Sequence, residues 1–385
     1  MFLKSTRLLL MMLAAGVIAL RPSPGVAAEG DTGHGSVEFG LGFYVNADDG
    51  DGNPFLDEEL TVVEPVVIFD YNVSDETELF GKLTYDYVSS ASIDRLNKFP
   101  EQSGASGDYY FGIDLGLRRE LDPVTTIGGF GSLSVEYDYV SVGVGGDYSK
   151  VLPHLSASYK WSANAFFDTI DVIRFDGKEE GSDNRSTLST TLEWYQMIDP
   201  LTHAEFGSSL SIQNGFLESA FNAVVIEDTG VPNANLVGSA PGREVTEVLP
   251  DSRVRGAVFG RVRRSLDPLN AVEMGGRLYA DSWGITSIAL EPRWYRWLVQ
   301  DAWLARLRYR LYVQTEADAY SEFLTTVPSE RTQDSDLADF NAHTLGGLLR
   351  WTPDDATAWE FGVDYVLRSD GINQMLGRVA RRKTF

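Results

Sequence analysis

The feature that most constrains this chain is an alternation of apolar and polar residues that recurs from one end of the sequence to the other. Over 155–165, Leu, Ala, Tyr and Trp alternate with Ser, Lys and Asn, and 108–118 and 359–365 show the same pattern. A period of two indicates β-strands, because successive side chains of a strand point to opposite faces of the sheet. Most of these stretches exceed the roughly 5–6 residues typical of soluble sandwich strands, which favours tilted strands that cross a membrane.

The segments between the expected strands alternate between short turns and long polar loops. The short turns lie at 74–75, 121–123, 152–153, 199–201, 267–269, 300–301 and 353–355, and the long loops at 47–59, 91–106, 169–183, 219–250 and 319–338. The expected strands are 35–46, 60–73, 76–90, 107–120, 124–139, 140–150, 154–168, 184–199, 203–218, 251–266, 270–284, 285–298, 302–318, 339–352, 357–369 and 373–385.

This pattern predicts an all-β fold, a transmembrane antiparallel β-barrel of about 16 strands (14–16) with short periplasmic turns and long extracellular loops. Three breaks, near 140, near 285 and before 373, are also compatible with a hinge or bulge inside one strand. Each such hinge would lower the strand number. The final segment is irregular, because three basic residues at 381–383 interrupt the alternation before the terminal Phe385.

The beginning of the chain resembles an export signal. Lys4 and Arg7 precede an apolar run over 8–20, and Val26 and Ala28 place small residues at the −3 and −1 positions of a cleavage site. The run is short for a bilayer-spanning helix, which needs about 20 apolar residues. We therefore expect a signal peptide over 1–28, a short N-terminal periplasmic segment over 29–34, and an outer-membrane barrel over 35–385.

Composition excludes some functions. The chain has 56 acidic and 32 Lys and Arg residues, a net charge of −24, and no cysteine. This balance argues against nucleic acid as a partner, because its binding requires a basic face. Part of the acid lies in the loop at 47–59, where Asp48, Asp49 and Asp51 resemble a calcium loop. The spacing of a full calcium loop is missing, so a solvated surface loop is favoured and we expect no metal or cofactor.

Tryptophans and prolines mark one end of the expected barrel. Pro123, Pro200 and Pro268 each follow an Asp, which predicts turns capped by the Asp side chain. Tryptophans lie near the short turns and predict an aromatic girdle at one membrane interface. They are Trp194, Trp297, Trp303, Trp351 and Trp359.

Several segments resemble the DUF3570 family of bacterial proteins of unknown function. They are Tyr85–Ser92, Ser134–Tyr139, Pro250–Arg253 and, the most specific, Leu278–Ser287. The resemblance implies an outer-membrane barrel and no assigned activity. It therefore supports the predicted fold and leaves the function to be argued from the residues.

The parity of the strands assigns charged residues to the lumen, because the apolar residues must face lipid. The predicted basic wall consists of Arg253, Arg255, Arg261, Arg263, Arg277, Arg293, Arg306, Arg308 and Arg310. The predicted acidic wall consists of Glu64, Asp70, Asp86, Asp114, Glu136 and Asp138. In a barrel of 16 strands the two walls face one another, which favours a wet pore that filters solutes by charge. A plug of paired charges is the alternative, and the segment 219–250 is a candidate to fold inward and narrow the pore.

The sequence thus predicts a porin-like passive channel for small polar solutes in the cell outer membrane. One alternative is a non-conducting barrel that anchors a lipoprotein or a periplasmic partner. A third hypothesis is a barrel enzyme acting on lipid, which the scattered histidines and missing catalytic motifs disfavour. Expected partners are outer-membrane lipid, lipopolysaccharide and the barrel-assembly machinery.

Overall fold

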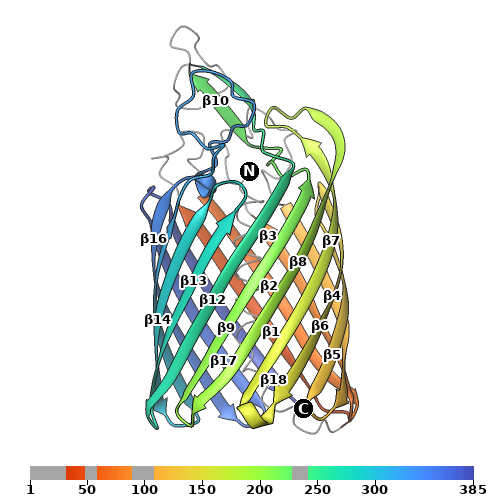
Figure 1. Ribbon diagram of the computed structural model, residues 1–385, viewed down its shortest axis with the longest axis vertical. Coiled ribbons are helices and arrows are strands. Elements are labelled where there is room, and N and C mark those ends of the chain that lie inside the picture. Colours follow the sequence, from red (N-terminus) through yellow and green to blue (C-terminus); the bar gives the residue numbers. More distant parts are fainter. Residues whose placement is uncertain (1–31, 48–58, 89–107, 228–241) are drawn as a thin grey trace.

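A computed structural model describes residues 32–47, 59–88, 108–227 and 242–385, and in these ranges the chain forms a closed barrel (Figure 1). Sixteen antiparallel strands follow one another around the barrel in chain order, and the last strand pairs with the first. The strands are β1 (Gly35–Ala47), β2 (Glu59–Ser74), β3 (Thr77–Val88), β4 (Asp108–Asp122), β5 (Thr125–Val135), β6 (Tyr139–Leu152), β7 (Ala157–Ile173), β8 (Glu179–Asp199), β9 (Thr202–Gly215), β12 (Ser252–Asp267), β13 (Asn270–Asp281), β14 (Thr286–Val299), β15 (Trp303–Gln314), β16 (Phe340–Asp354), β17 (Thr357–Arg368) and β18 (Asn373–Thr384). This confirms the predicted fold class.

All three ambiguous breaks separate two strands. Turns at 136–138, 282–285 and 369–372 join neighbouring strands, so the barrel has sixteen strands rather than fourteen. The irregular last segment is β18, and it closes the barrel by pairing with β1 from Asn373 to Thr384. On this strand Arg378 and Arg382 share the inner face, where they contact Glu360 and Asp70, whereas Arg381 and Lys383 point outward.

The pairing register assigns each side chain to one face, because directly paired residues share a face. Phe39, Leu115, Leu307 and Val363 belong to a set of large apolar side chains exposed on the outside. Their chain neighbours, among them Arg306 and Arg308, therefore point into the barrel. The outer surface is predominantly apolar, which suits hydrocarbon, and the inner surface carries most of the charges of the strands.

The two ends of the barrel differ, as the sequence predicts. At the short-turn end, Asp122, Asp199 and Asp267 accept hydrogen bonds from the backbone N–H two residues later at 2.8–2.9 Å, which caps each Asp-Pro turn. The turn after β6 is longer than expected. Pro153–Leu155 form a 3-10 turn (η1), and Ser156 has a φ of 50°, so β7 begins at Ala157 rather than at 154.

One predicted loop is largely strand. β7 and β8 continue through 169–183 as a paired hairpin that extends beyond the long-loop rim, with 174–178 as the turn that joins the two strands (Figure 1). Asp168 accepts from the Arg185 guanidinium at 2.6 Å, and Ser182 donates to Asp171 at 2.6 Å. These cross-strand contacts satisfy the polar residues that made the segment resemble a loop.

The segment 219–250 contributes a cap instead of an inward plug. Its described parts form a small hairpin of β10 (Ala223–Glu227) and β11 (Gly242–Thr246), which stands beyond the barrel rim (Figure 1). Val224 and Ile226 pack on Leu324 of the connection 315–339. Burying this apolar cluster stabilises the hairpin outside the lumen, so the expectation of an inward fold is wrong for these residues.

A different segment reaches the inner face at the rim. The turn η2 (Ser335–Leu337) lies beside Gln314 and Arg368, whose side chains donate to the Asp336 and Ala338 carbonyls and to the Asp336 carboxylate. Arg368 also stacks on the Phe340 ring at 3.8 Å. The connection 315–339 is therefore fixed to the mouth of the barrel.

Four of the five girdle tryptophans face outward, and one does not. Trp303 pairs with Trp351, which pairs with Trp359, and the first two rings stack with centroids 5.5 Å apart. Trp297 instead pairs with Leu304 on the inner face, because the β-bulge after Trp297 leaves its register with β15 unchanged. No helix in the described ranges is long and apolar enough to cross a bilayer.

Candidate functional site: the inner face of the barrel

The predicted basic side chains all lie on the inner face. The register places Arg253, Arg255, Arg261 and Arg263 inward on β12, Arg277 on β13, Arg293 on β14, and Arg306, Arg308 and Arg310 on β15. Alternation accounts for this, since the intervening residues on β15 are Leu307, Tyr309 and Leu311. We call β12–β15 the basic wall.

Some of these arginines are joined in a chain of ion pairs. Arg293 contacts Glu273 at 2.6 Å (Nη1–Oε1) and Glu291 at 2.5 Å (Nε–Oε1). Arg308 contacts the same Glu291 at 3.9 Å (Nη1–Oε1) and Asp364 at 2.8 Å (Nε–Oδ1). The chain runs from β13 to β17 and joins two guanidinium groups to three carboxylates.

A glycine makes the last of these contacts possible. Arg308, Gly346 and Asp364 occupy one register row on β15, β16 and β17. A Cβ at position 346 would lie 1.8 Å from Asp364 Oδ1 and 2.8 Å from Arg308 Cγ. Only a residue without a side chain lets the ion pair pass over β16.

Arg253 is locked into the wall at the long-loop end. Its Nε donates to Asp281 Oδ2 at 2.8 Å, its guanidinium lies 4.0 Å from the Trp283 ring centroid, and the residue is 5% exposed. Tyr279 also donates to Asp281, at 2.7 Å. Arg253 therefore orders the turn after β13 rather than facing open lumen, which corrects its expected place in the pore lining.

Other arginines of the basic wall have no carboxylate within ion-pair distance among the described residues. They are Arg255, Arg263, Arg277, Arg306 and Arg310. Arg263 stacks on Tyr295 at 3.9 Å, Arg277 lies 5.7 Å from the Phe259 ring, and Arg310 lies 5.2 Å from the Tyr312 ring. The Nε atoms of Arg255 and Arg306 are buried and have no hydrogen-bond partner in the described ranges. This wall therefore holds a surplus of cations.

The predicted acidic residues separate into two groups. Glu64, Asp70 and Asp114 lie half-buried on the inner face of β2 and β4, and Asp70 accepts from Ser36 at 2.6 Å. Asp86, Glu136 and Asp138 are buried. Glu136 and Asp138 occupy the turn after β5 rather than a strand, since β5 ends at Val135, so burial in the rim replaces the expected exposure to the lumen.

The described ion pairs of the barrel wall run along the wall. Some join neighbouring strands, as between Arg118 and Glu78. Others join two strands that are separated by one strand, as between Arg382 on β18 and Asp70 on β2. In the described ranges, none joins β2–β5 to the basic wall. The charges of each wall are therefore not paired with those of the other, and these residues do not form the alternative arrangement, a plug of pairs across the lumen.

Sequence reasoning missed several inner-face partners. Asp364 and Glu360 on β17 and Arg378 on β18 belong to the inner face, and Glu360 contacts Arg378. The alternation over 359–365 marks Glu360 and Asp364 as inward residues, but no spacing rule connects them to arginines on other strands. The candidate calcium residues Asp48, Asp49 and Asp51 lie outside the described residues.

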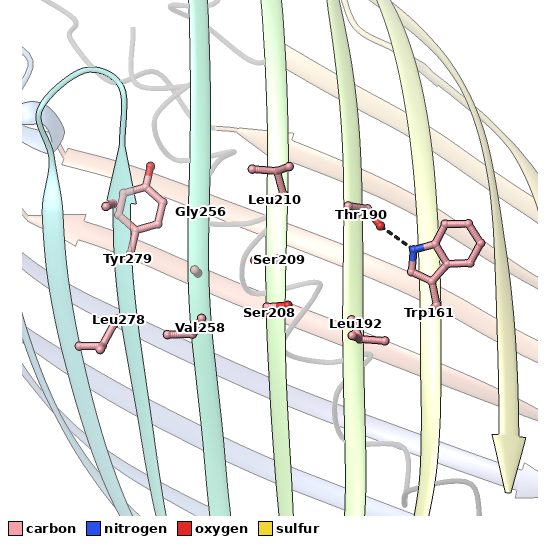
Figure 2. A pocket seen from close by; sticks show the side chains of 12 residues that line it. Trp161, Thr190, Leu192, Ser208, Ser209, Leu210, Gly256, Val258, Leu278 and Tyr279 are labelled. Carbon is pink, nitrogen blue, oxygen red and sulfur yellow. Dashed lines mark hydrogen bonds between the residues drawn. The ribbon is translucent and has the colours of Figure 1, made fainter.

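The outer face carries a shallow hollow of about 620 Å³ across β7, β8, β9, β12 and β13 (Figure 2). Small residues such as Ser208 and Gly256 lie between the larger Leu192, Leu210 and Val258. On one side, Trp161 Nε1 donates to Thr190 Oγ1 at 2.8 Å. Most of the lining side chains belong to the apolar face, so the hollow faces whatever surrounds the barrel rather than the lumen.

Comparison with known proteins supports the fold. The family model DUF3570, described as a protein of unknown function, matches residues 103–383. A search of curated proteins gives no match. A bacterial polysaccharide outer membrane secretin is similar with a TM-score of 0.51 at 10% identity, covering 91% of this chain and 98% of that one. At this identity the similarity concerns the fold, that of an outer-membrane β-barrel.

Two further solved structures are more distantly similar. The siderophore receptor PirA from Acinetobacter baumannii has a TM-score of 0.47 at 10% identity, with 88% of this chain and 53% of the receptor covered. The toluene transporter TodX from P. putida has a TM-score of 0.40 at 9% identity, with 94% and 95% covered. This chain spans about half the length of the siderophore receptor.

Proposed function

We infer that this chain, which belongs to the DUF3570 family of proteins of unknown function, acts as a passive channel for small polar solutes in the outer membrane. Its fold is that of outer-membrane barrels. A barrel of 16 strands is wide enough to leave an aqueous lumen. Export by the segment 1–28, insertion by the barrel-assembly machinery, and contact with lipid and lipopolysaccharide are parts of the same proposal.

One observation carries the proposal. The ion pairs described on the inner face run along the wall, and the acidic and basic walls are not joined across the lumen. Charged side chains that remain without partners are stable where water solvates them, because an unpaired charge in a dry interior is very costly. The surplus arginines of the basic wall therefore favour a wet lumen over a closed core.

The orientation follows from the two ends of the barrel. Short turns face the periplasm in outer-membrane barrels, which places the cap and the connection 315–339 outside the cell. A tag inserted at Ser329 should be reached by antibody on intact cells, whereas a tag at Asp267 should not. Labelling of the tag at Asp267 but not of the tag at Ser329 would show that the barrel has the opposite orientation.

The decisive test is electrical. Purified protein in a planar bilayer should give single-channel currents, and the salt-gradient reversal potential should report the charge of the walls. Replacing Arg306, Arg308 and Arg310 together with Gln should shift the preference toward cations, because the acidic wall then dominates. The matched control is Arg119→Gln, which removes one charge from an exposed side chain at the short-turn end and should leave the preference unchanged.

A second candidate function is a non-conducting barrel that anchors a lipoprotein or periplasmic partner. The observation that favours it is the turn η2, which Gln314 and Arg368 fix at the mouth. Absence of current from protein that still shows heat-modifiable migration, in both forms, would favour the anchor over the channel. Current with an unchanged ion preference in the triple variant would instead exclude the basic wall from selectivity.

A further inference from the structure

We propose that the basic wall holds a binding site for small oxyanions, with Arg277, Arg306 and Arg310 as the residues that contact the anion. The ligand class is a phosphate, sulfate or carboxylate group, either free or carried by a small solute. This inference deepens the proposed channel function and rests on it, because the lumen must be wet for a solute to reach the site.

The first support is that the neighbouring carboxylates are already engaged. Glu273 and Glu291 contact Arg293, and Asp364 contacts Arg308. These pairs use the acids that lie nearest the three arginines in the register. Arg277, Arg306 and Arg310 therefore have no carboxylate within ion-pair distance among the described residues.

The second support is the arrangement of the three arginines. Arg306 and Arg310 flank Arg308 on the inner face of β15, so their Cα atoms lie about 13 Å apart at the rise of a strand. Arg277 shares a register row with Ala289 and Tyr312, one row toward the long-loop end from Arg310. The small Ala289 leaves room for the side chains of Arg277 and Arg310 to approach each other.

The third support is that aromatic rings, rather than acids, hold two of these side chains. Arg277 lies near Phe259 and Arg310 near Tyr312. A ring fixes the plane of a guanidinium without neutralising it, and its N–H groups remain available. The Nε of Arg306 has no hydrogen-bond partner among the described residues, so the protein offers this donor no acceptor.

The geometry selects the ligand chemistry. A guanidinium presents paired N–H groups that match the two oxygens of a carboxylate or phosphate, and charge-assisted hydrogen bonds of this kind are stronger than neutral ones. Chloride is a single atom and has no pair of oxygens to accept the paired N–H groups. We therefore expect inorganic phosphate and sulfate to bind more tightly than chloride at equal ionic strength.

The test measures binding without current. Detergent-purified full-length protein is titrated with inorganic phosphate by calorimetry at constant ionic strength in chloride, and the Kd is compared with that of Arg277→Gln/Arg306→Gln/Arg310→Gln. We expect phosphate binding to weaken by about tenfold or more in the triple variant, because the charge-assisted hydrogen bonds of the three guanidinium groups are lost. The control is Arg118→Gln/Glu78→Gln, which removes a closed ion pair on β3 and β4 and should leave the Kd unchanged.

Replacement of the three arginines with Lys covers the case in which the Gln variant fails to fold. Lysine keeps the charge and loses the paired donors, so we expect binding intermediate between the wild type and no binding. Equal phosphate affinity in the wild type and the Lys variant would overturn the role of the paired donors. Wild-type protein that binds phosphate no better than chloride would overturn the site. Phosphate binding without any channel current would retain the site and reject the channel.

Discussion

The outer and inner faces of β15 and β16 place different demands on the same strands. On the outer face of β15, Leu307 is 54% exposed and Tyr309 is 36% exposed. On the inner face, Arg308 contacts Glu291 on β14 and Asp364 on β17. A residue at an outer position needs only to be apolar, because lipid chains make no specific contacts with it. A residue at an inner position must instead match the particular side chains beside it.

The glycines of β16 show the same difference. Gly346 and Gly347 are adjacent in the chain and lie on opposite faces. A Cβ at 346 would collide with the Arg308–Asp364 pair, whereas a Cβ at 347 would meet its nearest atom, Leu307 Cδ2, at 4.0 Å. The inner face thus restricts side-chain size as well as charge.

The largest expected effect comes from placing a charge on the outer face. Leu307→Arg should destabilise the barrel by about 2–4 kcal/mol if the residue lies near the bilayer midplane, because the guanidinium enters hydrocarbon. Urea titration of protein folded into lipid vesicles would measure the loss. Arg306→Leu, one residue away on the inner face, is the matched change. If Arg306→Leu proved as harmful as Leu307→Arg, the assignment of the two faces would be wrong.

The next effect concerns volume on the inner face. Gly346→Ala should cost about 1–3 kcal/mol, because the new methyl group displaces Asp364 from Arg308 and overpacks the wall. Gly347→Ala should stay within about 0.5 kcal/mol of the wild type, as is usual for an uncrowded surface position. The same urea titration compares both. Equal stability of the two variants would show that the Arg308–Asp364 pair adjusts freely and does not constrain β16.

This contrast also explains what the sequence can predict. The outer face repeats one rule, so alternation of the kind seen at Leu307 and Tyr309 predicts the strands and the direction of Arg308, and limits their number to 14–16. The inner face is built from pairs such as Arg308 and Asp364, which are 56 residues apart. Their contact depends on register and on Gly346, and neither is encoded locally. Glu136 and Asp138 show a related limit, since parity cannot reveal that a strand has ended.

A smaller effect is expected outside the membrane, where carboxylates lie between the cap and the connection 315–339. Asp334 lies near Asp336 and Glu247, and burial together with these like charges raises the pKa of Asp334 from 3.8 to about 7. Asp334 therefore binds its carboxyl proton more tightly while the cap is packed against the connection 315–339 than after the cap has opened. The resulting stability is present at acidic pH and is lost as the pH rises through about 7.

Amide exchange of β10 tests this prediction. Opening of the cap should increase by about thirtyfold between pH 5.5 and 8 in the wild type relative to Asp334→Asn, because the amide cannot ionise. The ratio of the two proteins at each pH cancels the intrinsic pH dependence of exchange. Asp339→Asn, at an exposed position of the same connection, should behave like the wild type. A constant ratio for Asp334→Asn across this range would show that Asp334 does not control the cap.

The smallest effect tests whether a polar contact on the outer face matters at all. Trp161 on β7 donates to Thr190 on β8 at 2.8 Å, beside the hollow of the outer face (Figure 2). Such hydrogen bonds within membranes contribute about 0.6 kcal/mol on average, because unfolded segments in lipid also find partners.

A double-mutant cycle of Trp161→Phe and Thr190→Val, measured by urea titration, isolates the coupling from the loss of ring area. Thr190 also donates to the Ser162 carbonyl at 2.9 Å, so Thr190→Ser is the control that keeps the hydroxyl. A coupling near 0.6 kcal/mol would agree with an outer face on which specific partners matter little. A coupling above about 2 kcal/mol would exceed the range seen for membrane hydrogen bonds and would break the contrast between the two faces at this position.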